Sequence, residues 1–287
     1  MVHPREPLVV WLLFGVVAVE ILVTYSRLPA RELYNVSGSG PEGGFSRALV
    51  FLNFPTALAA IGVLGAIVPW LPRRLRLSAL AAAVLCAAVA WPGVVRQSDL
   101  DARPVNAIAA VGVAAALALT LVACLPGRLR LDRWRLAAIA VLAVVALPWE
   151  AADLGFFLPG SVFMSGQHPD GSPLAAVHHG HHHGLDGVLL VVTALLLSRL
   201  RPRPLLAAYL ALMTSYGLAQ IVNDGWLEQM VKRGWSDDPI PNLLNPTLSL
   251  GWLAIVVAAA GLLAATRARA RSEASPHPPA RASGTPA

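Results

Sequence analysis

The chain has 287 residues, of which 56% are hydrophobic and 13% are charged, and its formal net charge is +6. This composition leaves too little polar surface to cover a water-soluble globule, so it excludes an ordinary soluble domain and indicates a membrane protein. The positive charge comes largely from arginines between apolar segments, where it suits an anionic leaflet. We therefore expect a lipid bilayer as the partner and no nucleic acid.

Apolar segments of about 20 residues, the length that crosses hydrocarbon as a helix, recur along the whole chain. They predict eight membrane-spanning helices, at approximately residues 8–26, 47–70, 77–95, 104–124, 136–157, 186–200, 205–223 and 247–266. Every span should be helical, because backbone groups in lipid have no other partners. We expect an all-α polytopic bundle over residues 1–266. A disordered cytoplasmic tail rich in Ala, Pro, Ser and Arg should follow over residues 267–287.

Arginines fall in alternate connections, which predicts the orientation of the helices. Positive residues in short connections stay on the cytoplasmic side, so both termini should be cytoplasmic and the connections that hold acids should face outward. The arginines that decide this are Arg73, Arg74, Arg76, Arg128, Arg130, Arg133, Arg135, Arg199, Arg201, Arg203, Arg267, Arg269 and Arg271. Lys232 is the only lysine. This usage is typical of a GC-rich bacterial genome and predicts a multi-pass protein of the plasma membrane.

A run of histidines precedes the sixth predicted span and faces outward in this topology. Neutral imidazoles at this density are ligands of transition metals, so the run predicts a site for zinc, iron or copper. The predicted ligands are His178, His179, His181, His182, His183 and Asp186. If the sixth helix extends outward through the run, four of them share one face: His179, His182, His183 and Asp186. Gly180 and Gly184 weaken such a helix, so the run can instead bend around an ion.

Acidic residues near the outer surface are candidate partners of this site. Glu150 and Asp153, at i and i+3 on the end of the fifth span, can act as a general base on water. Gln220, Asp224 and Glu228 follow each other at i, i+4 and i+8. The alternative is that these are polar helix ends that simply meet the membrane interface.

Glu20 differs from the other acids because it lies inside the first span with apolar residues on both sides. An ionisable group at that depth is costly, which predicts inward pairing or protonation and makes Glu20 a candidate functional residue. A helix-packing hydrogen bond is the alternative.

The pattern His-x-x-His-His occurs twice within the run, at His178/His181/His182 and at His179/His182/His183. It resembles one histidine box of the membrane di-iron desaturases and hydroxylases. Those enzymes have several separated boxes that normally face the cytoplasm, whereas this chain has one cluster that is predicted to face outward. Their activity is therefore not carried over.

Three classes of function are consistent with the sequence. The first is a membrane metalloenzyme that acts on a lipid-like or amphipathic substrate at the outer leaflet, with Glu150 or Asp153 as the base. The second is metal-ion uptake or handling, although acids and histidines are missing from the inner halves of the helices, where an ion path would need them. The third is a non-catalytic scaffold or accessory subunit in which the histidines are incidental.

Overall fold

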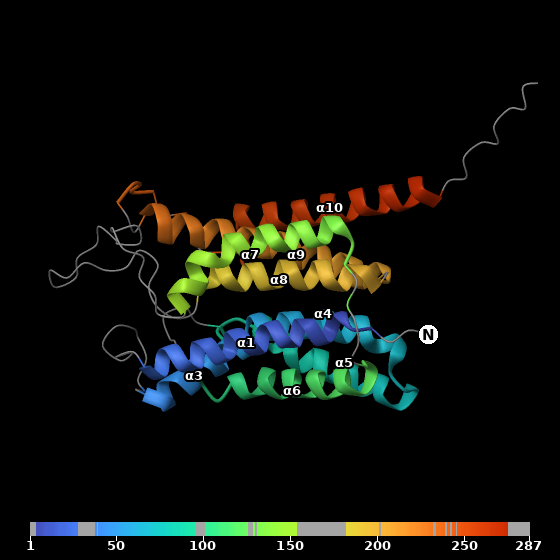
Figure 1. The fold of residues 1–287 in the computed structure, drawn as a ribbon, viewed down its shortest axis with the longest axis horizontal. Helices are drawn as coiled ribbons and strands as arrows, with labels where there is room; N and C mark the ends of the chain where they lie inside the picture. Colours follow the sequence, from blue (N-terminus) through green and yellow to red (C-terminus); the bar gives the residue numbers. More distant parts are fainter. Residues whose placement is uncertain are drawn as a thin grey trace, which may run out of the picture.

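The structure is a computed structural model of the full chain. It describes residues 4–27, 38, 40–95, 101–125, 129, 131–153, 182–200, 202–231, 234–238, 240–241, 243–244 and 246–274. Within these residues the fold is all-helical, as predicted, and contains no strand. The long helices run nearly parallel to one axis and form two groups, one from each half of the chain (Figure 1).

The first group contains the helices of the N-terminal half. They are α1 (Glu6–Arg27), α3 (Gly40–Asn53), α4 (Pro55–Ile67), α5 (Arg76–Ala87) and α6 (Asn106–Ala123), with the short 3-10 helices η1 (Val68–Trp70), η2 (Arg73–Leu75) and η3 (Ala88–Ala90). The predicted span at residues 47–70 is broken here, because α3 and α4 meet at an angle of 41°. Pro55 starts α4, where its missing N–H is not needed, and so separates the two helices.

The second group contains the helices of the C-terminal half. They are α7 (Arg133–Asp153), α8 (His183–Leu197), η5 (Ser198–Leu200), α9 (Pro204–Trp226), the π-helical η6 (Leu227–Val231) and α10 (Leu250–Ala274). Nearly all of α8 is buried, so it is the central helix of the bundle. Helix α10 continues beyond Arg267, where the tail was expected to begin, and ends at Ala274.

Six helices in the described part are long and apolar enough to cross a membrane, and the bent pair α3–α4 makes a seventh. The structure therefore supports six or seven of the eight predicted spans, and the predicted span at residues 77–95 is not among them. There the α-helix α5 has only 12 residues, with 3-10 turns of 3 residues directly before and after it, η2 and η3. At about 1.5 and 2.0 Å per residue the whole run rises roughly 30 Å, of which α5 supplies about 18 Å. Helix α1 begins at the same end of the bundle at which α10 ends (Figure 1).

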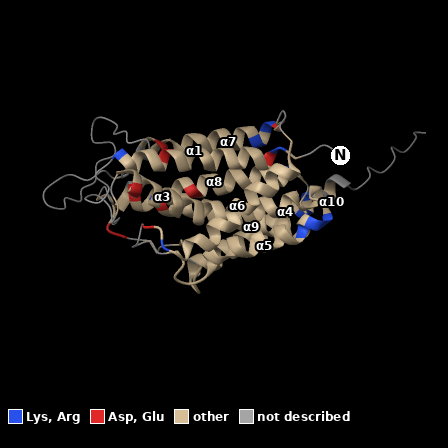
Figure 2. Ribbon diagram, turned by 90° about the horizontal axis from the view of Figure 1, so that it is seen from below, with Lys and Arg blue, Asp and Glu red and all other residues tan. Residues whose placement is uncertain are grey.

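The two ends of the bundle carry opposite charge. Among the described residues, most Lys and Arg lie at one end of the bundle and most Asp and Glu lie toward the other (Figure 2). We call these the arginine-rich end and the acidic end. Only 11% of the residues in the apolar stretches of α7 and α10 are buried inside the bundle, so the outward faces of these helices suit a lipid bilayer. The described chain is thus a candidate multi-pass membrane protein.

Close backbone approach and a few polar contacts hold the helices together. Gly187 of α8 lies against Gly217 of α9, where an added Cβ would come within 2.4 Å of the Gly217 carbonyl oxygen. The indole of Trp11 donates a 2.9 Å hydrogen bond to the Thr120 hydroxyl and so joins α1 to α6. Small residues and hydrogen bonds of this kind are the usual means of association in lipid, where helices gain little from burying apolar surface.

Candidate functional site

The histidine run meets the described structure at the beginning of α8. His178, His179 and His181 lie outside the described residues. His182 is the residue before the helix, in extended conformation with φ −124° and ψ 139°, and His183 is the first helical residue. The sixth helix therefore does not extend outward through the histidine run. His182 lies before the first helical residue and does not share a helical face with His183.

His182 and Asp186 are almost fully buried, with 2% and 1% of their surfaces exposed. His183 keeps 30% of its side chain exposed, and its Nδ1 lies 3.3 Å from Asp186 Oδ2. Asp186 sits in the first turn of α8, where the helix dipole favours a negative charge. A carboxylate at Nδ1 fixes the orientation of an imidazole, as is usual for histidines that act as ligands or bases.

Asp224 connects α9 to the beginning of α8. Its Oδ2 accepts a 2.9 Å hydrogen bond from the backbone N–H of Gly184. The first N–H groups of a helix lack partners within the helix, so this carboxylate caps α8 from a neighbouring helix. Asp224, a candidate partner of the histidine run, therefore contacts the backbone of the residue that follows His183.

Glu228 lies one turn after Asp224 in η6 and is 5% exposed. Single π-helical turns often occur at functional sites. We call His182, His183, Asp186, Asp224 and Glu228 the acidic-end cluster.

The indole of Trp149, a residue of α7, also lies at the beginning of α8. Its ring packs on Gly184, where an added Cβ would lie 2.3 Å from Trp149 Cζ2, and a Cβ added to Gly225 of α9 would lie 3.9 Å from the same atom. Glu150 follows Trp149 directly and is half-buried. Asp153 is the last residue of α7, and its side chain lies outside the described part. Three helices therefore converge at the cluster, with a predicted base next to the tryptophan.

Glu20 is a half-buried residue of α1. Its Oε2 is buried with no hydrogen-bond partner among the described residues. No described contact joins it to the acidic-end cluster. The expectation that it pairs inward is therefore not supported in this part of the chain.

Sequence reasoning found Gln220 but missed Tyr216. Gln220 Nε2 donates a 2.6 Å hydrogen bond to the Tyr216 hydroxyl, and that hydroxyl donates to the Leu244 carbonyl at 2.7 Å. Tyr216, Gln220, Asp224 and Glu228 all fall on one face of α9 and its π-helical extension, at i, i+4, i+8 and i+12. Continuing the spacing one turn back from Gln220 would have revealed the tyrosine.

Among the described residues, no group of three or more His, Cys, Asp and Glu side chains is arranged to hold a metal ion. The described part of the cluster supplies an imidazole–carboxylate pair, another buried histidine and two more buried acids. The remaining predicted ligands are the three histidines outside the described part. Both cysteines are buried in the bundle and lie outside this cluster.

We expect Gly184→Ala to destabilise the protein by about 1–2 kcal/mol, because the new methyl group overlaps the Trp149 ring. The double variant Gly184→Ala/Trp149→Leu should lose less stability than the sum of the single variants, since the smaller side chain relieves the overlap. Unfolding in mixed micelles measures the three values. Strict additivity would contradict the packing of Trp149 on Gly184.

Comparison with known proteins returns no match to the chain, whether to a protein-family model, a curated protein or a solved structure. The structure defines a candidate multi-pass helical membrane protein in which His182, Asp186, Asp224 and Glu228 are buried toward one end of the bundle.

Proposed function

We propose that the acidic-end cluster is part of a transition-metal site for zinc, iron or copper, and that the chain is a membrane metalloenzyme acting on a lipid-like or amphipathic substrate. The observation that carries the proposal is the His183–Asp186 pair at the beginning of α8. It lies beside the buried His182 and directly follows three more histidines in the sequence.

The donor set suits such a metal. Imidazole nitrogen and carboxylate oxygen bind zinc, iron and copper alike. Asp186 at Nδ1 of His183 orients the ring, as a carboxylate commonly does for a histidine that binds a metal. A metal held there would supply Lewis acidity. Glu150 and Asp153, at the end of α7, would accept a proton from water.

The distribution of charge supports a position at the outer leaflet. The cluster lies at the acidic end, and the arginines of the connections gather at the opposite end (Figure 2). Because arginine-rich connections are retained in the cytoplasm, the cluster would face the extracytoplasmic side of the plasma membrane.

The metal content of the untagged full-length protein tests the proposal. We expect His182→Ala/His183→Ala to lower bound metal, measured by elemental analysis, to the background of the buffer. The matched control is His3→Ala/His277→Ala, which removes the same number of imidazoles elsewhere in the sequence and should leave the metal content unchanged. Equal metal content in both variants would overturn the metal site.

Asp186→Asn separates a dedicated site from chelation by a histidine-rich segment. Loss of a carboxylate that orients a ligand typically lowers metal affinity 10- to 100-fold. We expect a decrease of about that size in a competition titration. Chelation by the histidines alone would leave the affinity unchanged. If the wild-type protein carries the metal into vesicles, the result would contradict the proposed enzymatic function and indicate metal transport instead.

A further inference from the structure

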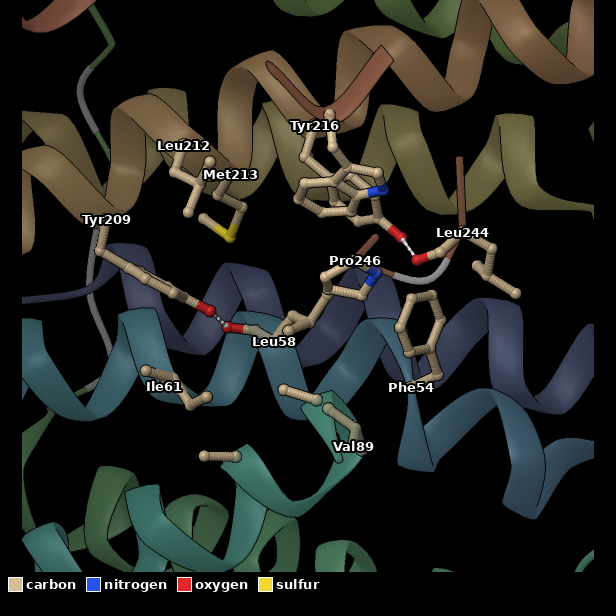
Figure 3. A pocket seen from close by; sticks show the side chains of 13 residues that line it. Phe54, Leu58, Ile61, Val89, Tyr209, Leu212, Met213, Tyr216, Leu244 and Pro246 are labelled. Atoms are coloured by element: carbon tan, nitrogen blue, oxygen red, sulfur yellow. Dashed lines mark hydrogen bonds between the residues drawn. The ribbon is translucent and has the colours of Figure 1, made fainter. Parts of the chain in front are cut away.

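A cavity of about 410 Å³ lies in the apolar interior, between the two groups of helices. Its walls come from α4, η3, α9, the beginning of α10 and the segment at Leu244 and Pro246. Figure 3 shows Met213 and Tyr216 on α9 facing Leu58 and Ile61 across it. The volume falls in the range of roughly 300–1,000 Å³ that is typical of small-molecule sites.

The end of the third pass forms one side of this space. Helix α5 is followed by η3, which ends at Ala90. Ala87, Val89 and Ala90 line the cavity together with Phe54, the residue before α4, and with Tyr216 of α9. The cavity therefore lies where the third pass ends, next to helices long and apolar enough to cross a membrane.

The side chains that line the cavity are apolar or aromatic, so the cavity suits a hydrocarbon chain better than water. Tyr209 donates its hydroxyl hydrogen to the Leu58 carbonyl at 2.7 Å, and the Tyr216 hydroxyl is bonded to both Leu244 and Gln220. An ordered water needs two to four polar partners, whereas both hydroxyls are engaged and the indole N–H of Trp252, which has no partner among the described residues, is a single donor. Phe54 and Trp252 pack on the Tyr216 ring, with centroids 6.5 and 5.3 Å away, and add aromatic surface.

The cavity reaches the surface of the bundle on its membrane-facing side. Ala87, Ala90 and Pro246 contribute to its walls and are exposed. At the depth of η3 the surroundings of the protein are lipid, so the occupant enters from the bilayer. An acyl or isoprenoid chain fits this entrance and these walls.

Tyr216 also relates the cavity to the acidic-end cluster along α9. It forms part of the cavity wall, Gln220 bonds to it, and Asp224 follows one turn after Gln220. Gln220 is 1% exposed and packs against Gly187 of α8, so protein fills the space between the cavity and Asp224. From Tyr216 to Asp224 the helix rises about 12 Å.

We propose that this cavity binds the hydrocarbon chain of a lipid that enters from the bilayer. That the bound lipid is the substrate rests on the proposed function. Binding of the chain in the cavity does not depend on a metal.

Photolabelling of the full-length protein in vesicles tests this inference. The probe is a phosphatidylglycerol with a diazirine in one acyl chain, diluted into unlabelled phosphatidylglycerol. We expect saturable labelling of α4 and α9 peptides that include Leu58 and Met213. Met213→Trp, which fills the cavity from α9, should reduce this labelling at least fivefold. Leu12→Trp on the exposed face of α1 should not change it.

Ala90→Phe narrows the entrance from an exposed position and provides a second variant if Met213→Trp fails to fold. Labelling restricted to the lipid-facing sides of α7 and α10, or labelling that Ala90→Phe leaves unchanged, would overturn the inference. Elemental analysis separates it from the proposed function. Blocking the cavity should leave the metal content unchanged, and the His182→Ala/His183→Ala variant should lose metal but retain the labelling.

Discussion

Replacing Gly187 with alanine is expected to lower the free energy of unfolding of the bundle by about 3 kcal/mol. The new Cβ would lie 2.4 Å from the carbonyl oxygen of Gly217 and 3.0 Å from Gln220 Cβ. Backbone cannot rotate away as a flexible side chain can, so α8 and α9 must separate. Separation would also pull Asp224 of α9 away from the Gly184 N–H of α8. Unfolding of the protein in mixed micelles measures the loss.

Gly15→Ala is the matched control for this substitution. Gly15 is also helical, but nothing lies within 4 Å of an added Cβ there. Alanine at such a position is expected to stabilise the protein by roughly 0.5–1 kcal/mol, because glycine loses more freedom on folding. Equal effects at Gly15 and Gly187 would mean that the two backbones do not approach each other as closely as the structure shows.

The sequence was sufficient for the features that depend on hydropathy and charge. Apolar stretches predicted helices at nearly every position where the structure has them, and the arginines predicted the two-ended distribution of charge. The structure does not support the predicted span at residues 77–95, because the α-helix there has only 12 residues between two short 3-10 turns. Hydropathy measures how apolar a segment is, but not how long its α-helix is. Pro55, in contrast, was a visible indication that the second span would break.

Only part of the candidate site could be predicted from the sequence. Asp186 and Asp224 could be predicted, because one follows the histidines directly and the other belongs to a spaced acidic series. The contact of Trp149 with Gly184 could not, since it depends on how α7 packs against α8. The cavity could not be predicted either, because it depends on how η3, α4, α9 and α10 pack around the segment at Leu244 and Pro246.

Breaking the ion pair between Arg199 and Glu6 at the arginine-rich end is expected to cost about 2 kcal/mol, between the values typical of exposed and of buried pairs. Arg199 Nη1 lies 2.7 Å from Glu6 Oε1, with 26% and 9% of the two side chains exposed. Glu6→Gln leaves the arginine without its charged partner, whereas Glu6→Gln/Arg199→Gln removes both charges. The double variant should therefore recover part of the lost stability in a double-mutant cycle.

This pair also bears on the acidic-end cluster. It ties α1 to η5, directly after the end of α8, and α8 begins at His183. If the pair sets the axial position of α8, Glu6→Gln should weaken metal binding at the far end of the helix, and the double variant should restore it. A Glu6→Gln protein with lower stability but unchanged metal affinity would show that the hydrogen bond from Gly184 to Asp224 positions the beginning of α8 by itself.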